Sequence, residues 1–127
     1  MARMEHFAIF ATDPKSLKDF YIQVMGLRLA VDNGAASPPG YFLVDDAGVA
    51  LEIIGRHAEV EACDTRYVCH VAFTVDDVAD TRHRLEHLGR CFEADTAVDT
   101  PEMKTAFFRD PEGHRLQIVW RARPLGS

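Results

Sequence analysis

The chain contains 127 residues, of which 47% are hydrophobic and 27% are charged. These proportions are typical of one compact domain and exclude disorder throughout the chain. The 14 Lys and Arg residues against 20 Asp and Glu residues give a net charge of −6. Because the chain has no basic cluster, we expect no nucleic acid partner.

Membrane insertion and a disulfide framework are also not expected. No apolar stretch approaches the ~20 residues of a membrane-spanning helix, and the N-terminus has no apolar block typical of a signal peptide. We therefore expect a cytoplasmic protein without a membrane partner. The cysteines at positions 63, 69 and 91 are odd in number and form no CxxC motif, which indicates reduced thiols.

The chain contains an internal repeat. Residues 6–13 (HFAIFATD) match residues 70–77 (HVAFTVDD) at an offset of 64, and residues 48–55 (GVALEIIG) match residues 113–120 (GHRLQIVW) at an offset of 65. We therefore predict one domain over residues 1–127 that consists of two modules, at about 3–58 and 66–121.

The first module is predicted to begin with a half-buried strand and to continue with a helix. Asp13 is a suitable N-cap, Pro14 suits the first helical position, and Gly26 is a suitable terminator. The apolar residues between them recur at helical spacing, at Leu17, Phe20, Tyr21 and Val24. A loop is predicted over residues 32–39, and a hairpin turn over residues 45–48 (DDAG).

The second module is predicted to follow the same plan. Asp76 or Asp77 is the expected helix cap and Gly89 the expected terminator, and residues 110–113 (DPEG) form the second hairpin turn. Each module is thus predicted to be βαβββ, which places the protein in the α+β class. One helix covers only one face of a four-stranded sheet, so the two sheets are expected to pack face to face or to align side by side.

Polar residues interrupt the predicted strands at matching positions of the two modules. They are His6 and Glu52 in the first module and His70 and Gln117 in the second. With three-residue turns, Phe42 lies across from Glu52 and Phe107 across from Gln117. Burying a polar group without a partner costs about 1–3 kcal/mol, so a common meeting point would explain all four residues.

These features resemble the vicinal oxygen chelate superfamily, which includes glyoxalase I, extradiol dioxygenases and bleomycin-resistance proteins. The resemblance lies in the paired βαβββ plan, the first-strand histidines and the hairpin at residues 108–117 (FRDPEGHRLQ). It implies a cupped, half-open mixed sheet barrel that binds a divalent metal. One ligand would come from the first strand and one from the last strand of each module, namely His6, Glu52, His70 and Gln117.

The resemblance also implies a chemistry. The metal, expected to be nickel, zinc, cobalt or manganese, would bind a small substrate through two adjacent oxygens and stabilise an enolate-like anion. The family usually has Glu where this chain has Gln117, which cannot accept a proton. Glu52 is therefore the expected general base as well as a ligand. The leading interpretation is a glyoxalase-like enzyme that performs proton transfer, isomerisation or addition.

Two other interpretations remain open. Two histidines and one carboxylate also suit the Fe(II) of an extradiol-type dioxygenase, and the same hollow without a metal would sequester a ligand as bleomycin-resistance proteins do. All three interpretations imply a small-molecule partner, and the resemblance implies a homodimer. The site is expected either within one chain or between two chains.

Other residues have both a structural and a functional interpretation. Phe42 and Phe107 would line the substrate or pack in the core. Arg109 and Arg115 would bind a substrate carboxylate or phosphate, or pair with nearby acidic residues. His83 and His87 have the i, i+4 spacing of a zinc site, but their charged neighbours favour a solvated helix face.

Overall fold

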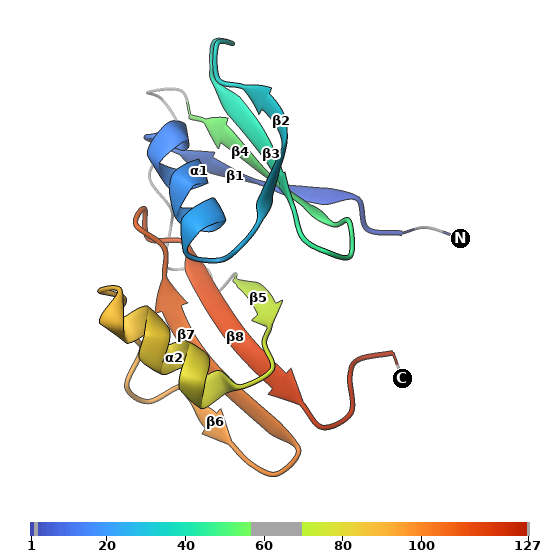
Figure 1. The fold of residues 1–127 in the computed structure, drawn as a ribbon, viewed down its shortest axis with the longest axis vertical. Coiled ribbons are helices and arrows are strands. Elements are labelled where there is room, and N and C mark those ends of the chain that lie inside the picture. Colours follow the sequence, from blue (N-terminus) through green and yellow to red (C-terminus); the bar gives the residue numbers. More distant parts are fainter. Residues whose placement is uncertain (2, 57–69, 127) are drawn as a thin grey trace. The chain divides into compact units, whose positions relative to one another are not determined.

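A computed structural model describes residues 1, 3–56 and 70–126 of the chain. The chain divides into two compact units, Met1–Asp64 and Thr65–Ser127. Each unit contains one four-stranded mixed sheet and one helix (Figure 1). The predicted α+β class with two βαβββ modules is confirmed.

The elements of the two units follow each other in the same order. The first unit contains β1 (His6–Ala11), α1 (Pro14–Gln23), β2 (Arg28–Asn33), β3 (Gly40–Val44) and β4 (Ala50–Gly55). The second contains β5 (Val71–Thr74), α2 (Val78–His87), β6 (Val98–Asp99), β7 (Met103–Arg109) and β8 (Arg115–Arg121). The sheet orders are β1-β4-β3-β2 and β5-β8-β7-β6. In each sheet the first and last strands of the unit pair in parallel, and the other pairs are antiparallel.

Both helices begin at the cap that the sequence suggests. The Asp13 carboxylate accepts a hydrogen bond from the Ser16 amide at 3.1 Å, and the Asp77 carboxylate accepts one from the Asp80 amide at 2.9 Å. These bonds satisfy amide groups that have no partner within the helix. Of the two candidate caps for α2, the structure therefore selects Asp77.

One face of each sheet forms a core with its helix. In the first unit, α1 contributes the buried Leu17 and Tyr21, and the strands that it contacts contribute buried residues such as Ile53. In the second unit, α2 contributes Leu85 above β7 and β8, whose largest fully buried residues are Phe108, Leu116 and Ile118. Because side chains alternate along a strand, the residues between these core positions lie on the opposite face.

The two hairpin turns have the predicted form. Gly48 and Gly113 have φ values of +86° and +92°, in a region where other residues are strained. In each turn the glycine amide donates a hydrogen bond to the carbonyl of the first residue, Asp45 or Asp110. The turns produce the predicted registers, in which Phe42 pairs with Glu52 and Phe107 with Gln117.

The predicted loop at residues 32–39 begins two residues too early. Asp32 and Asn33 belong to β2, where they pair with Tyr41 and Gly40 of β3. The polar side chains are tolerated because β2 lies at the edge of its sheet and all six of its residues are exposed.

Other expectations concern single side chains and the membrane. Cys91 is a free, exposed thiol, whereas Cys63 and Cys69 lie outside the described residues. In the described part of the chain, neither helix is long and apolar enough to cross a membrane.

The packing of the second unit's core can be tested at Leu85, which lies in α2, and at Leu88, which is the C-terminal cap of α2. Leu85 is fully buried, whereas the Leu88 residue is 52% exposed. Leu85→Ala should lower the free energy of unfolding by about 2–4 kcal/mol, because it removes buried methyl groups and leaves a cavity. Leu88→Ala is the control and should cost less than about 1 kcal/mol. Urea denaturation followed by circular dichroism measures both, and equal losses would contradict this packing.

Candidate functional site

The first unit brings two predicted metal ligands together on the sheet face opposite α1. Leu51 and Ile53 are buried on the helix side of β4, so Glu52 between them lies on the other face. His6 begins β1, which pairs with β4. The His6 Nε2 atom lies 3.6 Å from Glu52 Oε1, and the two side chains are 38% and 24% exposed.

A second carboxylate orients the His6 ring. His6 Nδ1 lies 2.7 Å from Glu5 Oε1. The carboxylate accepts this hydrogen bond, so in the neutral ring Nδ1 carries the proton and Nε2 keeps its lone pair. A histidine that donates its other N–H to a carboxylate in this way is typical of metal sites. The lone pair of Nε2 and the Glu52 carboxylate are donors that suit a divalent metal ion.

The second unit holds His70 and Gln117 at positions equivalent to those that His6 and Glu52 hold in the first unit. Gln117 of β8 pairs with Ala72 of β5, as Glu52 of β4 pairs with Ala8 of β1. His70 is two residues before Ala72, as His6 is two residues before Ala8. In the described part of this unit, no hydrogen bond joins His70 to Gln117.

Each imidazole contacts the phenylalanine that pairs with the acidic or amide residue. The His6 and Phe42 rings meet edge to face at 5.4 Å, and the His70 and Phe107 rings meet edge to face at 5.1 Å. Such contacts stabilise a ring in one orientation. The two candidate substrate-lining phenylalanines therefore also position the two histidines.

Donor clusters of three or more are not present in the described ranges. Among residues 1, 3–56 and 70–126, no group of three His, Cys, Asp or Glu side chains lies close enough together to hold a metal ion. His6 and Glu52 form a pair of donors within one unit, and a complete site needs further ligands. His83 and His87 are exposed on α2, as expected for a solvated face.

Arg115 forms an ion pair within the second unit. Its guanidinium donates to both carboxylate oxygens of Glu93, at 2.7 and 2.8 Å, and lies 3.7 Å from the centre of the Phe107 ring. Hydrogen bonds from Arg115, with a smaller effect of the Thr96 hydroxyl, lower the pKa of Glu93 to about 2. Arg115 thus connects Glu93 to the ring that contacts His70.

Arg109, the second arginine that the sequence suggested for substrate binding, stabilises the hairpin between β7 and β8. Arg109 Nη1 donates to the Gly113 carbonyl at 2.8 Å, and Arg109 pairs with Arg115 across the hairpin. Sequence analysis did not identify Glu93, which lies 22 residues before its partner Arg115 and in no motif. A single acidic residue in a connecting segment carries no signal of such a long-range pair.

Comparison with known proteins identifies the family. The model of the glyoxalase/bleomycin resistance protein/dioxygenase superfamily matches residues 3–118. The chain belongs to this superfamily, as the sequence resemblance predicted.

Its relatives include both sequences and solved structures. The chain is 27% identical to the uncharacterized protein YaeR of Escherichia coli (strain K12), over 93% of this chain and 95% of that one. The crystal structure of SMU.1112c is similar with a TM-score of 0.75 and 27% identity, over 94% of this chain and 99% of that one. The fosfomycin resistance protein FosX of Listeria monocytogenes, solved with Mn(II) and sulfate, has the same fold (TM-score 0.74, 16% identity, 98% and 93% covered).

The ion pair between Glu93 and Arg115 predicts that the free energy of unfolding decreases at acidic pH. Its pKa in the folded protein is about 2, against an ordinary value of 4.5. Its contribution to stability is therefore complete above about pH 4.5 and is lost as the pH falls toward 2. Glu93→Gln should lower the free energy of unfolding by about 1–2 kcal/mol at pH 7, less than the full pKa shift implies because the side chain is 28% exposed. Urea titrations at pH 7, 5 and 3 measure this loss.

The control for this prediction is Glu86→Gln. Glu86 lies 3.5 Å from Arg82 on the surface of α2, and exposed pairs of this kind contribute little. Its removal should change the free energy of unfolding by less than about 0.5 kcal/mol. The difference between wild type and Glu93→Gln should shrink at pH 3, and a constant difference across the three pH values would contradict the assigned cause.

Proposed function

We propose that the protein is a glyoxalase-like enzyme that uses a divalent metal ion to move a proton on a small substrate with two adjacent oxygens. The observation that supports it is the pair formed by His6 and Glu52. The imidazole presents Nε2 to the carboxylate at 3.6 Å, while Glu5 holds the opposite nitrogen of the ring. This arrangement orients a histidine for a metal and leaves a carboxylate beside it.

The proposed ligand set extends to the second unit. His6 and Glu52 would bind the metal together with His70 and Gln117, as the family resemblance implies. Gln117 would contribute its carbonyl oxygen, which is a neutral donor. The four ligands would come either from one chain or from the two chains of a homodimer. We propose that the metal is manganese, nickel, zinc or cobalt. Manganese is supported by FosX, which was solved with Mn(II).

The proposed proton transfer and substrate contacts are assigned to residues of this chain. A bound divalent metal polarises a substrate carbonyl and stabilises negative charge on its oxygen. Glu52 is the proposed base, because its carboxylate can accept a proton from the carbon beside that carbonyl, whereas the amide of Gln117 cannot. The side chain of Glu52 is 24% exposed, so a substrate can reach it. Phe42 and Phe107 are the proposed apolar contacts of the substrate.

Arg109 and Arg115 are better suited to stabilise the second unit than to bind a charged group of the substrate. Arg115 is bound by Glu93 at 2.7 and 2.8 Å, and Arg109 donates to a backbone carbonyl at 2.8 Å. A substrate carboxylate would have to compete with Glu93 for Arg115. We therefore propose that the substrate is recognised mainly by its chelating oxygens and apolar surface.

Metal content tests the ligand set. Protein purified without added metal, or reconstituted with Mn(II) and dialysed, should contain about one ion per chain by elemental analysis. His6→Ala and His70→Ala should each lose most of it, because each removes one nitrogen ligand. Glu5→Ala should weaken Mn(II) binding by about 10–100-fold through the orientation of His6, and Glu102→Ala, an exposed acid elsewhere, should not.

The outcomes separate the proposed function from its alternatives. Metal retained by the His6→Ala variant would contradict the proposed site. Ferrous iron in the purified protein would favour an extradiol-type dioxygenase. No metal in either preparation would favour a metal-free protein that sequesters a ligand, as the bleomycin-resistance members of the superfamily indicate.

Glu52→Gln tests the proposed base. Protein loaded with Mn(II) should catalyse exchange of deuterium from D2O into the carbon next to the carbonyl of a small α-hydroxyketone such as dihydroxyacetone. Glu52→Gln should slow this exchange by about 100-fold or more, because it removes the group that accepts the proton. Proton NMR measures the rate, with Mn(II) alone and Glu102→Gln as controls. Equal rates for Glu52→Gln and wild type, at equal metal content, would remove Glu52 from the mechanism.

A further inference from the structure

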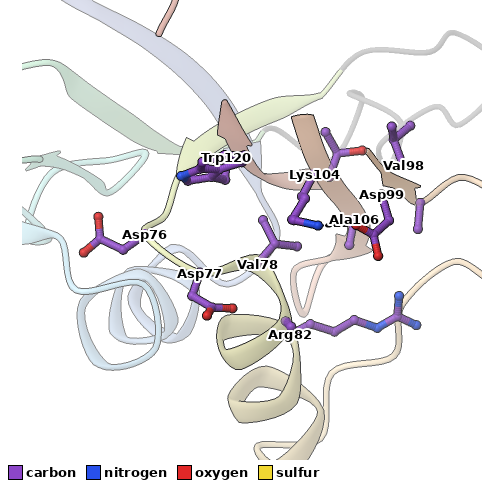
Figure 2. A pocket seen from close by; sticks show the side chains of 12 residues that line it. Asp76, Asp77, Val78, Arg82, Val98, Asp99, Lys104, Ala106 and Trp120 are labelled. Atoms are coloured by element: carbon purple, nitrogen blue, oxygen red, sulfur yellow. Dashed lines mark hydrogen bonds and ion pairs between the residues drawn. The ribbon is translucent and has the colours of Figure 1, made fainter. Parts of the chain in front are cut away.

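The second unit contains a pocket of about 440 Å³ between α2 and the strands β6, β7 and β8. This volume lies within the range of small-molecule sites. Figure 2 shows Trp120 and Lys104 along one side of the pocket and Asp77 and Arg82 along the other, with Val78 between them. Ala106 of β7 also lines the pocket.

The pocket lies on the opposite face of the sheet from Gln117. Trp120 is three residues after Gln117 in β8, and Ala106 precedes Phe107, the partner of Gln117, in β7. Because neighbouring side chains of a strand point to opposite faces, Ala106 and Trp120 point toward α2. The pocket is therefore distinct from the proposed metal site and does not depend on the proposed function.

Comparison of the two units explains the space. Ile53 and Ile118 hold equivalent, fully buried positions, and their partners in the neighbouring strands are Tyr41 and Ala106. Tyr41 is 6% exposed and packs on the helix side of the first sheet, whereas the smaller Ala106 holds the equivalent position in the second sheet and lines the pocket.

The cationic residues that line the pocket already have partners. Lys104 Nζ forms a hydrogen-bonded ion pair with Asp99. The Arg82 guanidinium lies 3.5 Å from Glu86 and 4.9 Å from the centre of the Phe92 ring. These contacts reduce the ability of Lys104 and Arg82 to bind an anion.

The acidic residues beside Trp120 are less compensated. Asp77 caps α2, and Asp76 is exposed and forms no hydrogen bond or ion pair with any of the described residues. Asp99, the third carboxylate that lines the pocket, is paired with Lys104, so Asp76 is the lining carboxylate without a partner among the described residues. An indole ring beside the unpaired Asp76 carboxylate attracts organic cations through its π face and through charge.

We propose that this pocket binds a small organic cation, with its ammonium group near Asp76 and Trp120 and its apolar part against Val78 and Ala106. A carboxylate ligand of the same size would meet the carboxylates at the mouth of the pocket. A neutral ligand would gain the apolar contacts but no electrostatic attraction. The ligand class is therefore an amine or quaternary ammonium with a compact apolar body.

The intrinsic fluorescence of the protein tests the proposal, because Trp120 is the single tryptophan of the chain. Benzyltrimethylammonium should cause a saturable change in this fluorescence in metal-free buffer with EDTA. Benzyl alcohol and phenylacetate, which carry the same ring with neutral and negative groups, should bind more weakly. The absence of metal keeps the result independent of the proposed enzyme.

Two variants identify the pocket and its charge. Ala106→Tyr introduces the side chain of the first unit and should abolish the saturable change. Asp76→Asn should weaken binding by roughly two- to fivefold, as expected for a charge at the surface, whereas Asp46→Asn, an exposed acid of the first unit, should not. Circular dichroism checks that the variants fold, and if Ala106→Tyr does not, Asp76→Asn and the phenylacetate comparison carry the test. No saturable change, equal binding of phenylacetate, or unaltered binding by folded Ala106→Tyr would overturn the proposal.

Discussion

The candidate site depends on the alternation of side chains in the last strand of each unit. Leu51 and Ile53 must face α1 to be buried, and this requirement turns Glu52 to the opposite face. In the second unit Leu116 and Ile118 impose the same constraint on Gln117. The hydrophobic core on one side of the sheet therefore determines which polar groups are available on the other. A shift of one residue would bury Glu52 and expose its apolar neighbours.

Much of this arrangement could be predicted from the sequence, because local signals specify it. The Asp and Gly residues of the two turns define the loop length, and the loop length defines the pairs Phe42–Glu52 and Phe107–Gln117. The caps and terminators of the helices are equally local. The end of β2 was misplaced because Asp32 and Asn33 are typical of loops, and only the pairing with β3 keeps them in an edge strand.

The features that sequence analysis missed are contacts between side chains. Glu5 could be seen beside His6, but its hydrogen bond to Nδ1 depends on the rotamers of both side chains. Glu93 reaches Arg115 from a connecting segment, and Arg115 in turn lies over Phe107. Each of these residues orients a group that the sequence did identify. Supporting contacts depend on side-chain rotamers or on tertiary packing, whereas strand positions depend on a pattern with a period of two residues.

The internal repeat separates what the fold needs from what each unit has acquired. Positions that maintain the core are alike in both units, as Ile53 and Ile118 are, both fully buried. Positions that differ lie on both sides of the sheets. Glu52 corresponds to Gln117 on one side, and Tyr41 corresponds to Ala106 on the other. Because both units keep the same strand order and register, neither difference is needed to form the sheet. The charge of Glu52 and the large ring of Tyr41 are therefore features of the first unit alone, and the strand order and register that the two units share depend on neither of them.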